Sequence, residues 1–346
     1  MIQIIKKDRE LWELFAREEE YSSDKLDHYG RFPYSASKNK SIFEPKVSEY
    51  LVNNGLKIQY PKGKKFAVCL THDIDFIDQR RKEYLKDSVK ALGELDLSSA
   101  INNLIAGLDK SKTPLKNFKE IISLEEKYDA KSSFYFLALE ESDQDYNFNV
   151  ASLKEEFLGI VKMGWEVGLH GGHTAYNNLD VLLEEKKRLE NAFGLEVIGY
   201  RNHYLRFKTP DTWELLSNAG FKYDTTFGYA DMAGFRNGMC HPFKPYNLKT
   251  DKEIEILEIP LVIMDRTFLS YINLNLNEAW DLTKRLIDAT EKNNGVLTLL
   301  WHNNQMSGEM GRFYEKILGY CKERNAWMTS GKEICNWWIE KQKKNS

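Results

Sequence analysis

With 346 residues, 42% of them hydrophobic, the chain can bury an enzyme-sized core as one large domain with an appendage. The formal net charge is -3, and its 49 basic and 52 acidic residues are interspersed, so no basic face for nucleic acid is expected. The four cysteines form no C-x-x-C pair, and the sequence contains neither an apolar leader of signal-peptide length nor a membrane-spanning window, which predicts a cytoplasmic location.

The first part of the chain, residues 1–64, is predicted to be an N-terminal elaboration packed on the main domain. It contains one helical pattern over residues 9–20 and then a polar stretch. The stretch ends in the turn-rich segment Tyr60-Pro61-Lys62-Gly63-Lys64-Lys65, which leads into the first apolar run. We therefore expect the main domain to cover residues 65–342.

From residue 66 onward, short β-branched or aromatic runs alternate with segments whose apolar residues recur every three to four positions. Strands that alternate with helices predict a parallel sheet, because each helix carries the chain back across the sheet. The expected fold is α/β, a distorted seven-stranded (β/α) barrel. Its predicted strands cover residues 66–70, 133–138, 166–169, 196–200, 222–225, 256–263 and 296–301.

Residues 76–115 interrupt this alternation after the first strand. Their apolar residues have helical spacing in two successive stretches, which predicts an inserted helical pair. The simpler interpretation is that both apolar stripes pack on the barrel. The alternative is a lid or a dimer surface near the first strand's end.

Polar residues follow several of the apolar runs, and a parallel barrel brings such residues together at its carboxyl-terminal face. Asp73 and Asp75 stand two positions apart after the first run, so a continuing strand would point both side chains the same way. In metal-assisted hydrolysis one carboxylate binds the cation while a neighbouring one accepts the proton of water. The pair therefore predicts a hydrolytic site.

Histidines supply further candidate ligands. His170 and His173 follow the third run with two glycines between them, and imidazole is the commonest protein ligand of transition metals. Together with an aspartate they would form a His/His/Asp metal site with open positions. His72, His203 and His241 compete for the same roles, and residue spacing does not rank them.

Three more polar residues complete the predicted site. Arg201 ends the fourth run, where its guanidinium could keep Asp73 ionised. His302 ends the most apolar run and suits a general acid for a departing amine. A nearby carboxylate such as Asp224 would tune the pKa of His302.

In this order, the motifs resemble those of the polysaccharide deacetylases with NodB homology, carbohydrate esterase family four. The resemblance covers about residues 66–340, and the first motif is of a divergent type. It rests on the segments Thr71-His72-Asp73-Ile74-Asp75, His170-Gly171-Gly172-His173, Arg201-Asn202-His203-Tyr204, Asp224 with its neighbours, and Leu299-Leu300-Trp301-His302.

The resemblance implies a role for each matching residue. Asp73 would be the general base, tethered by Arg201, and His302 the general acid, while the backbone N–H of Tyr204 would polarise the acyl oxygen. Asp224 would belong to the fourth motif. A divalent ion, zinc in most of this family, would be held by three protein ligands: Asp75, His170 and His173.

The sequence departs from the family pattern at the metal ligands. Ile74 separates two aspartates that are usually adjacent, and the usual four-residue spacing of the histidines would place Thr174, not His173, at the second ligand position. His203 stands where the family usually has proline. Whether His173, Thr174, His72 or His203 completes the site therefore stays open.

The predicted function is removal of an N-acetyl group from an amino sugar of a surface glycan or its precursor by a metal-dependent hydrolase. The expected partner is thus an N-acetylated saccharide. One alternative is a related amidohydrolase that acts on another C–N bond, with or without a metal. The other is a catalytically silent glycan-binding barrel.

Overall fold

The computed structural model describes residues 1–79, 81–108 and 113–345. Its main sheet is parallel, with neighbouring strands in the order β8-β5-β4-β3-β2-β1-β10-β9, and β11 pairs with the start of β1. The strands are β1 (Ala67–Ile74), β2 (Ser133–Leu137), β3 (Glu166–Gly171), β4 (Gly199–Asn202), β5 (Tyr223–Asp224), β8 (Leu257–Glu258), β9 (Leu261–Met264), β10 (Val296–Leu300) and β11 (Trp327–Thr329).

The sheet has the α/β architecture of a distorted, partly open barrel, which confirms the predicted fold class. The predicted strand over residues 256–263 is divided into β8, which pairs with β5, and β9, which pairs with β10. Pro260 lies at the break and has no N–H to donate to a sheet. If β8 and β9 are taken as one interrupted strand, seven parallel strands surround the barrel, and β11 is an addition that the sequence pattern did not predict.

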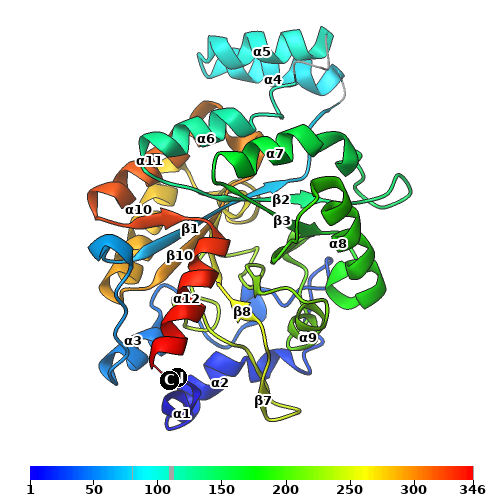
Figure 1. The fold of residues 1–346 in the computed structure, drawn as a ribbon. Coiled ribbons are helices and arrows are strands. Elements are labelled where there is room, and N and C mark those ends of the chain that lie inside the picture. The colour runs from blue at the N-terminus through cyan, green and yellow to red at the C-terminus, as the bar shows by residue number, and fades with distance from the viewer. Residues whose placement is uncertain (80, 109–112, 346) are drawn as a thin grey trace.

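Helices cover the outside of the sheet (Figure 1). Helix α8 illustrates why they form where they do: the Asn178 side chain accepts hydrogen bonds from the first free amides, and Gly194 ends the helix with φ of 80°. The helices around the barrel are α6 (Phe118–Lys127), α7 (Lys154–Lys162), α8 (Leu179–Phe193), α9 (Asp211–Asn218), α10 (Leu276–Lys292), α11 (Gly308–Glu323) and α12 (Gly331–Asn345). Among the described residues, no helix combines the length and the apolar character that crossing a membrane requires.

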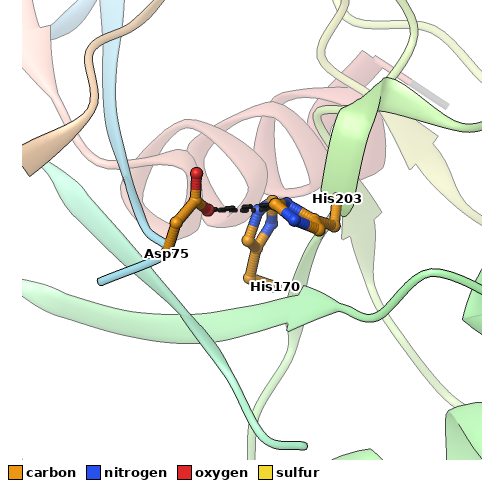
Figure 2. A group of neighbouring side chains, drawn as sticks. All are labelled: Asp75, His170 and His203. Atoms are coloured by element: carbon orange, nitrogen blue, oxygen red, sulfur yellow. Dashed lines mark hydrogen bonds and ion pairs between the residues drawn. The ribbon is translucent and has the colours of Figure 1, made fainter. Parts of the chain in front are cut away.

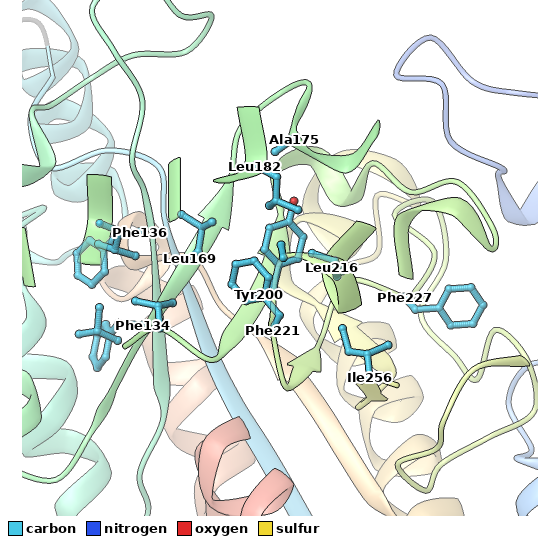
Figure 3. Close-up of a cluster of buried hydrophobic side chains, with 14 of the residues drawn as sticks. Phe134, Phe136, Leu169, Ala175, Leu182, Tyr200, Leu216, Phe221, Phe227 and Ile256 are labelled. Atoms are coloured by element: carbon cyan, nitrogen blue, oxygen red, sulfur yellow. The ribbon is translucent and has the colours of Figure 1, made fainter. Parts of the chain in front are cut away.

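The largest buried cluster lies between the sheet and these helices. Figure 3 shows Phe134, Leu169 and Tyr200, which come from the neighbouring strands β2, β3 and β4. All three are fully buried. Because the strands are tightly packed, the polar side chains at their carboxyl ends have little freedom to move. This packing keeps the side chains of a shared site in fixed positions relative to one another.

The N-terminal segment contains α1 (Ile2–Ile5), α2 (Arg9–Ala16) and α3 (Lys46–Asn53). Its buried residues Ile5, Phe15 and Val47 belong to the same hydrophobic cluster as Phe134 of the barrel. The predicted helix over residues 9–20 ends earlier, because Arg17 adopts a left-handed conformation with φ of 56°. A short antiparallel hairpin of β6 (Tyr246–Asn247) and β7 (Lys252–Glu253) lies apart from the main sheet.

The inserted helices are α4 (Arg81–Gly93) and α5 (Leu97–Leu108). In Figure 1 they form a hairpin at the top of the molecule, beyond α6 and α7. The prediction of a helical pair holds, but the expectation that its apolar stripes pack on the barrel is wrong. The large aliphatic side chains of the hairpin are exposed, whereas Tyr84 and small residues such as Ser88, Ala91 and Ala100 are buried.

Candidate metal centre

Five polar side chains lie at the carboxyl ends of neighbouring strands. Asp73 is near the end of β1 and Asp75 follows it, while His170, Arg201 and His302 lie at the ends of β3, β4 and β10. The strands are parallel and in register, with His170 directly opposite Arg201. Parallel alignment therefore brings residues that are far apart in the sequence to one mouth of the barrel.

Asp75, His170 and His203 converge on one point (Figure 2). Asp75 Oδ1 lies 3.2 Å from His170 Nε2 and 3.5 Å from His203 Nδ1, and the two nitrogens are 3.1 Å apart. His203 begins a short 3₁₀ turn directly after β4, so the turn aims its ring back at the strand ends. One carboxylate oxygen and two imidazole nitrogens are a donor set that suits zinc.

The surroundings of these atoms fit a bound cation. His170 Nδ1 is 3.1 Å from the carbonyl oxygen of Arg201, which can only accept, so Nδ1 carries the proton and Nε2 presents a lone pair. Asp75 Oδ1 is buried and accepts no hydrogen bond from the residues that the structure describes. A divalent ion would satisfy both atoms and His203 Nδ1 together.

The electrostatics keep Asp75 charged. Burial raises the pKa of its carboxyl group, but the nearby imidazoles, His203 foremost, outweigh burial and hold that pKa well below its usual range. For His170 the opposing effects are burial, which lowers the imidazole pKa, and the charge of Asp73, which together with Asp75 raises it overall. Asp75 is thus in the ionised form that a metal ligand needs, and a bound metal would displace the proton that the carboxylates favour on His170.

Asp73 lies beside this group. Its Oδ2 is 3.6 Å from His170 Nε2 and 4.0 Å from Arg201 Nη1, and its Oδ1 accepts no hydrogen bond within the described residues. Arg201 is fully buried and is held by the hydroxyls of Thr225 and Thr71, at 3.0 and 3.1 Å. The carboxylate therefore faces the site with a free oxygen and a fixed positive charge behind it.

His302 approaches from the other side, with Nε2 3.7 Å from Asp75 Oδ2. Its Nδ1 is 2.7 Å from Asp265 Oδ1. Burial lowers the pKa of the imidazole, but Asp265, followed by Asp75 and Asp73, raises it to about 9. His302 is thus protonated at neutral pH, with the Nε2 proton directed towards the site.

The carboxylate at His302 is Asp265, not Asp224 as the sequence suggested. Asp224 is fully buried, and its Oδ1 accepts hydrogen bonds from the amide and hydroxyl of Thr226. It lies against Glu258, whose pKa burial and the charge of Asp224 raise well above the usual value. Asp224 is therefore a buried residue of the barrel wall, and its contacts are with Thr226 and Glu258.

The other histidines are placed apart from the group of three. His173 is half-buried, burial lowers its pKa, and its Nδ1 has no partner within the described residues. His72 is bound through both ring nitrogens, to Trp301 O at 2.8 Å and Glu125 Oε1 at 2.9 Å. Thr174 is exposed. The geometry thus substitutes His203 for His173 in the candidate ligand set, because the turn after β4 points His203 inward.

Tyr204 lies at the rim in a left-handed conformation with φ of 59°, which is uncommon for a non-glycine residue and typical of functional sites. Arg31 donates a hydrogen bond to its carbonyl oxygen at 2.6 Å. Tyr29 stacks on its ring with centroids 4.5 Å apart. The N-terminal segment therefore supports the mouth of the barrel through Tyr29 and Arg31. This contact was not predicted from the sequence.

Two carboxylates at the site, Asp265 and Asp145, were not predicted from the sequence. Asp265 directly follows the apolar strand β9, so the rule that identified Asp73 and His302 could also have found it. Asp145 lies in a loop, with Oδ2 3.6 Å from His203 Nε2, and its pKa is lowered, first by hydrogen bonding to His203. No local pattern marks a loop residue of this kind.

Comparison with known proteins gives matches only at the level of structure. No protein-family model and no curated protein matches the chain. Among solved structures, a candidate polysaccharide deacetylase from Mycobacterium smegmatis is 17% identical with a TM-score of 0.56, over 82% of this chain and 94% of that one. At this identity the likeness concerns the fold alone.

Two more distant matches complete the comparison. The wild-type BA3943 protein from Bacillus anthracis, a CE4 family pseudoenzyme, is 13% identical over 80% of this chain and 66% of its own, with a TM-score of 0.41. The peptidoglycan deacetylase PdaC from Bacillus subtilis is 12% identical over 83% and 96%, with a TM-score of 0.36. The chain thus shares its α/β fold, a distorted barrel with a parallel sheet, with the mycobacterial protein, and it carries at the barrel mouth an Asp-His-His group suited to a metal.

Proposed function

We propose that the protein is a zinc-dependent hydrolase that removes N-acetyl groups from an amino sugar. The observation that carries the proposal is the convergence of Asp75, His170 and His203 beside Asp73 and His302. This arrangement supplies a candidate cation site, a carboxylate and a protonated imidazole at one mouth of the barrel. Metal-assisted hydrolysis of an unactivated amide uses these three functions: a Lewis acid, a general base and a general acid.

Zinc bound by Asp75, His170 and His203 would supply Lewis-acid activation of water and of the acetamido carbonyl. Asp73 then accepts the proton of the attacking water on Oδ1, the oxygen to which no described residue donates a hydrogen bond. Arg201 Nη1, 4.0 Å from Asp73 Oδ2, places a fixed positive charge beside this carboxylate.

His302 donates a proton from Nε2 to the departing sugar amine, since an amine leaves readily only when it is protonated. Asp265 holds the opposite nitrogen at 2.7 Å and so directs the ring and stabilises its charge. The backbone N–H of Tyr204 is the proposed donor to the developing oxyanion. The tyrosine rings at positions 29 and 204 supply flat surfaces of the kind on which sugar rings stack.

The experiment is an acetate-release assay on N-acetylated oligosaccharides, with protein that has been stripped by a chelator and reloaded with zinc. Turnover should require the metal. Asp73→Asn should abolish turnover while zinc content stays at the parent level, because Asp73 is the base and not a ligand. His302→Ala should reduce kcat by roughly 10²- to 10⁴-fold.

Asp251→Asn is the matched control, since Asp251 is an exposed aspartate with a side-chain exposure of 85%. It should behave as the parent does. If zinc-loaded protein releases no acetate, or if Asp73→Asn retains parental turnover, the proposed function is wrong. Turnover that persists at full rate without metal would favour a metal-independent amidohydrolase instead.

A further inference from the structure

The helical hairpin α4–α5 concentrates exposed apolar side chains. Of the 18 large hydrophobic residues that are exposed in the described chain, nine lie between residues 85 and 108. They are Leu85, Val89, Leu92, Leu95, Leu97, Ile101, Leu104, Ile105 and Leu108. Soluble proteins rarely expose so many apolar side chains in one contiguous place unless the surface binds something.

The packing within the hairpin explains why these side chains face outward. The two helices meet through one tyrosine and several small residues: the Ser88 hydroxyl donates to the carbonyl oxygen of Ala100 at 2.6 Å, and a Cβ on Gly107 would lie 3.5 Å from that of Tyr84. This seam buries Tyr84 against Gly107, together with Ser88, Ala91 and Ala100, and the leucines and isoleucines of both helices lie outside it. The large aliphatic residues are therefore directed out of the hairpin.

The hairpin's acidic residues lie on a different side. A cleft of about 1020 Å³ separates the hairpin from the barrel, and Glu83, Asp87, Glu94 and Asp96 line it together with polar residues. None of the nine apolar residues lines this cleft. The polar side of the hairpin thus faces the barrel, and its apolar side faces away.

Basic residues border the apolar side. On α4, Lys82 and Lys86 each stand three positions before an exposed apolar residue, Leu85 and Val89, so they lie beside them on the helix surface. Their side chains are 66% and 70% exposed, and their ion pairs with Glu83 are exposed and weak. Helix α5 carries no charged residue.

We propose that this hairpin binds the surface of an anionic lipid bilayer. The apolar side chains enter the boundary between head groups and acyl chains, and Lys82 and Lys86 contact lipid phosphates. Charge decides between this occupant and a second copy of the chain. In either case Lys82 and Lys86 keep only their weak, exposed ion pairs with Glu83 of their own helix, and Asp87, Glu94 and Asp96 line the cleft. A second copy packed apolar side to apolar side would therefore offer the two lysines no further carboxylate, whereas an anionic bilayer offers them phosphates.

The test is co-sedimentation of the whole protein with vesicles made of phosphatidylcholine and phosphatidylglycerol in equal parts, compared with vesicles of phosphatidylcholine alone. The parent protein should bind the anionic vesicles, and high salt should weaken binding. Neither readout depends on catalytic activity, so the result is independent of the proposed hydrolase function.

Two sets of substitutions test the two components of the surface. The triple variant Val89→Ser, Leu97→Ser, Ile101→Ser should lower the partition coefficient at least about tenfold, because it removes the inserted side chains. The charge reversals Lys82→Glu and Lys86→Glu should lower binding to anionic vesicles by at least about tenfold. All five residues are exposed, so circular dichroism of both variants should match the parent.

The matched control is Leu183→Ser with Lys187→Glu, an exposed leucine and lysine on α8, and it should bind as the parent does. Absence of vesicle binding by the parent overturns the proposal. So does equal binding by all variants. A parent that is dimeric by light scattering, that fails to bind vesicles, and whose triple variant is monomeric would show that the surface joins two copies instead.

Discussion

Replacement of His203 by alanine is the most informative perturbation of the candidate metal centre. His203 Nδ1 lies 3.5 Å from Asp75 Oδ1 and 3.1 Å from His170 Nε2, so the substitution removes one of three converging donors. Loss of a residue that merely orients a ligand weakens metal binding about 10- to 100-fold. Loss of a ligand itself should exceed this, so zinc affinity should fall by more than about 100-fold, or about 3 kcal/mol.

His173→Ala is the matched comparison, because it removes an imidazole three residues from His170 that lies outside the group of three. Its zinc affinity should stay within about tenfold of the parent value. Competition with a chromophoric chelator measures both dissociation constants, and thermal unfolding of the metal-free proteins shows whether each variant is folded.

The opposite pattern would refute the geometric argument. If His173→Ala loses zinc and His203→Ala retains it, the metal is held as the resemblance to the deacetylases implies, and the turn after β4 must adopt another conformation. Equal retention in both variants would show that neither histidine is a ligand.

Three further predictions concern other parts of the molecule. Asp265→Asn removes the carboxylate that raises the pKa of His302 to about 9. The basic limb of the profile of kcat against pH should therefore move to lower pH. If that limb does not move, His302 is not the titrating acid. Burial raises the pKa of Glu185 to about 7, so between pH 4.5 and pH 7 its carboxyl group holds a proton in the folded state that it has lost in the unfolded state. The free energy of unfolding should therefore fall by about 3 kcal/mol as the pH rises through this range. Glu185→Gln should remove this slope in urea unfolding measured across that range, and an unchanged slope would show that another group causes it. Phe136→Ala should lower the free energy of unfolding by about 3–5 kcal/mol in urea titration, because Phe136 is fully buried against Phe118 and Phe157; a loss below about 1 kcal/mol would contradict this packing.

The sequence alone was sufficient for the fold class, because a parallel sheet leaves a strong local signal. Strands buried on both faces are continuous apolar runs, and β1, β3 and β10 lie within one to four residues of the bounds that those runs predicted. Polar residues that follow such runs must lie at one edge of the sheet, which is why Asp73, Asp75, His170 and His302 could be grouped before any coordinates.

The identity of the third donor depended on tertiary structure. Sequence spacing left His173 and His203 as rivals, since a residue just beyond a strand can turn either way. The 3₁₀ turn after β4 and its left-handed Tyr204 direct His203 inward, and the Arg31 guanidinium, 173 residues earlier in the chain, holds that turn through the Tyr204 carbonyl. A contact over that distance leaves no local trace in the sequence.

For the inserted helices, too, the sequence predicted the elements, but only the tertiary structure showed which way their side chains face. Their apolar spacing predicted two helices, and both are present, but spacing cannot say what an apolar stripe faces. Tyr84, Ser88, Ala91 and Ala100 form the seam between the helices, and this packing leaves the large aliphatic side chains facing outward. Local periodicity thus determined which elements form, whereas the direction of their faces was decided only by packing, because burial depends on residues distant in the chain.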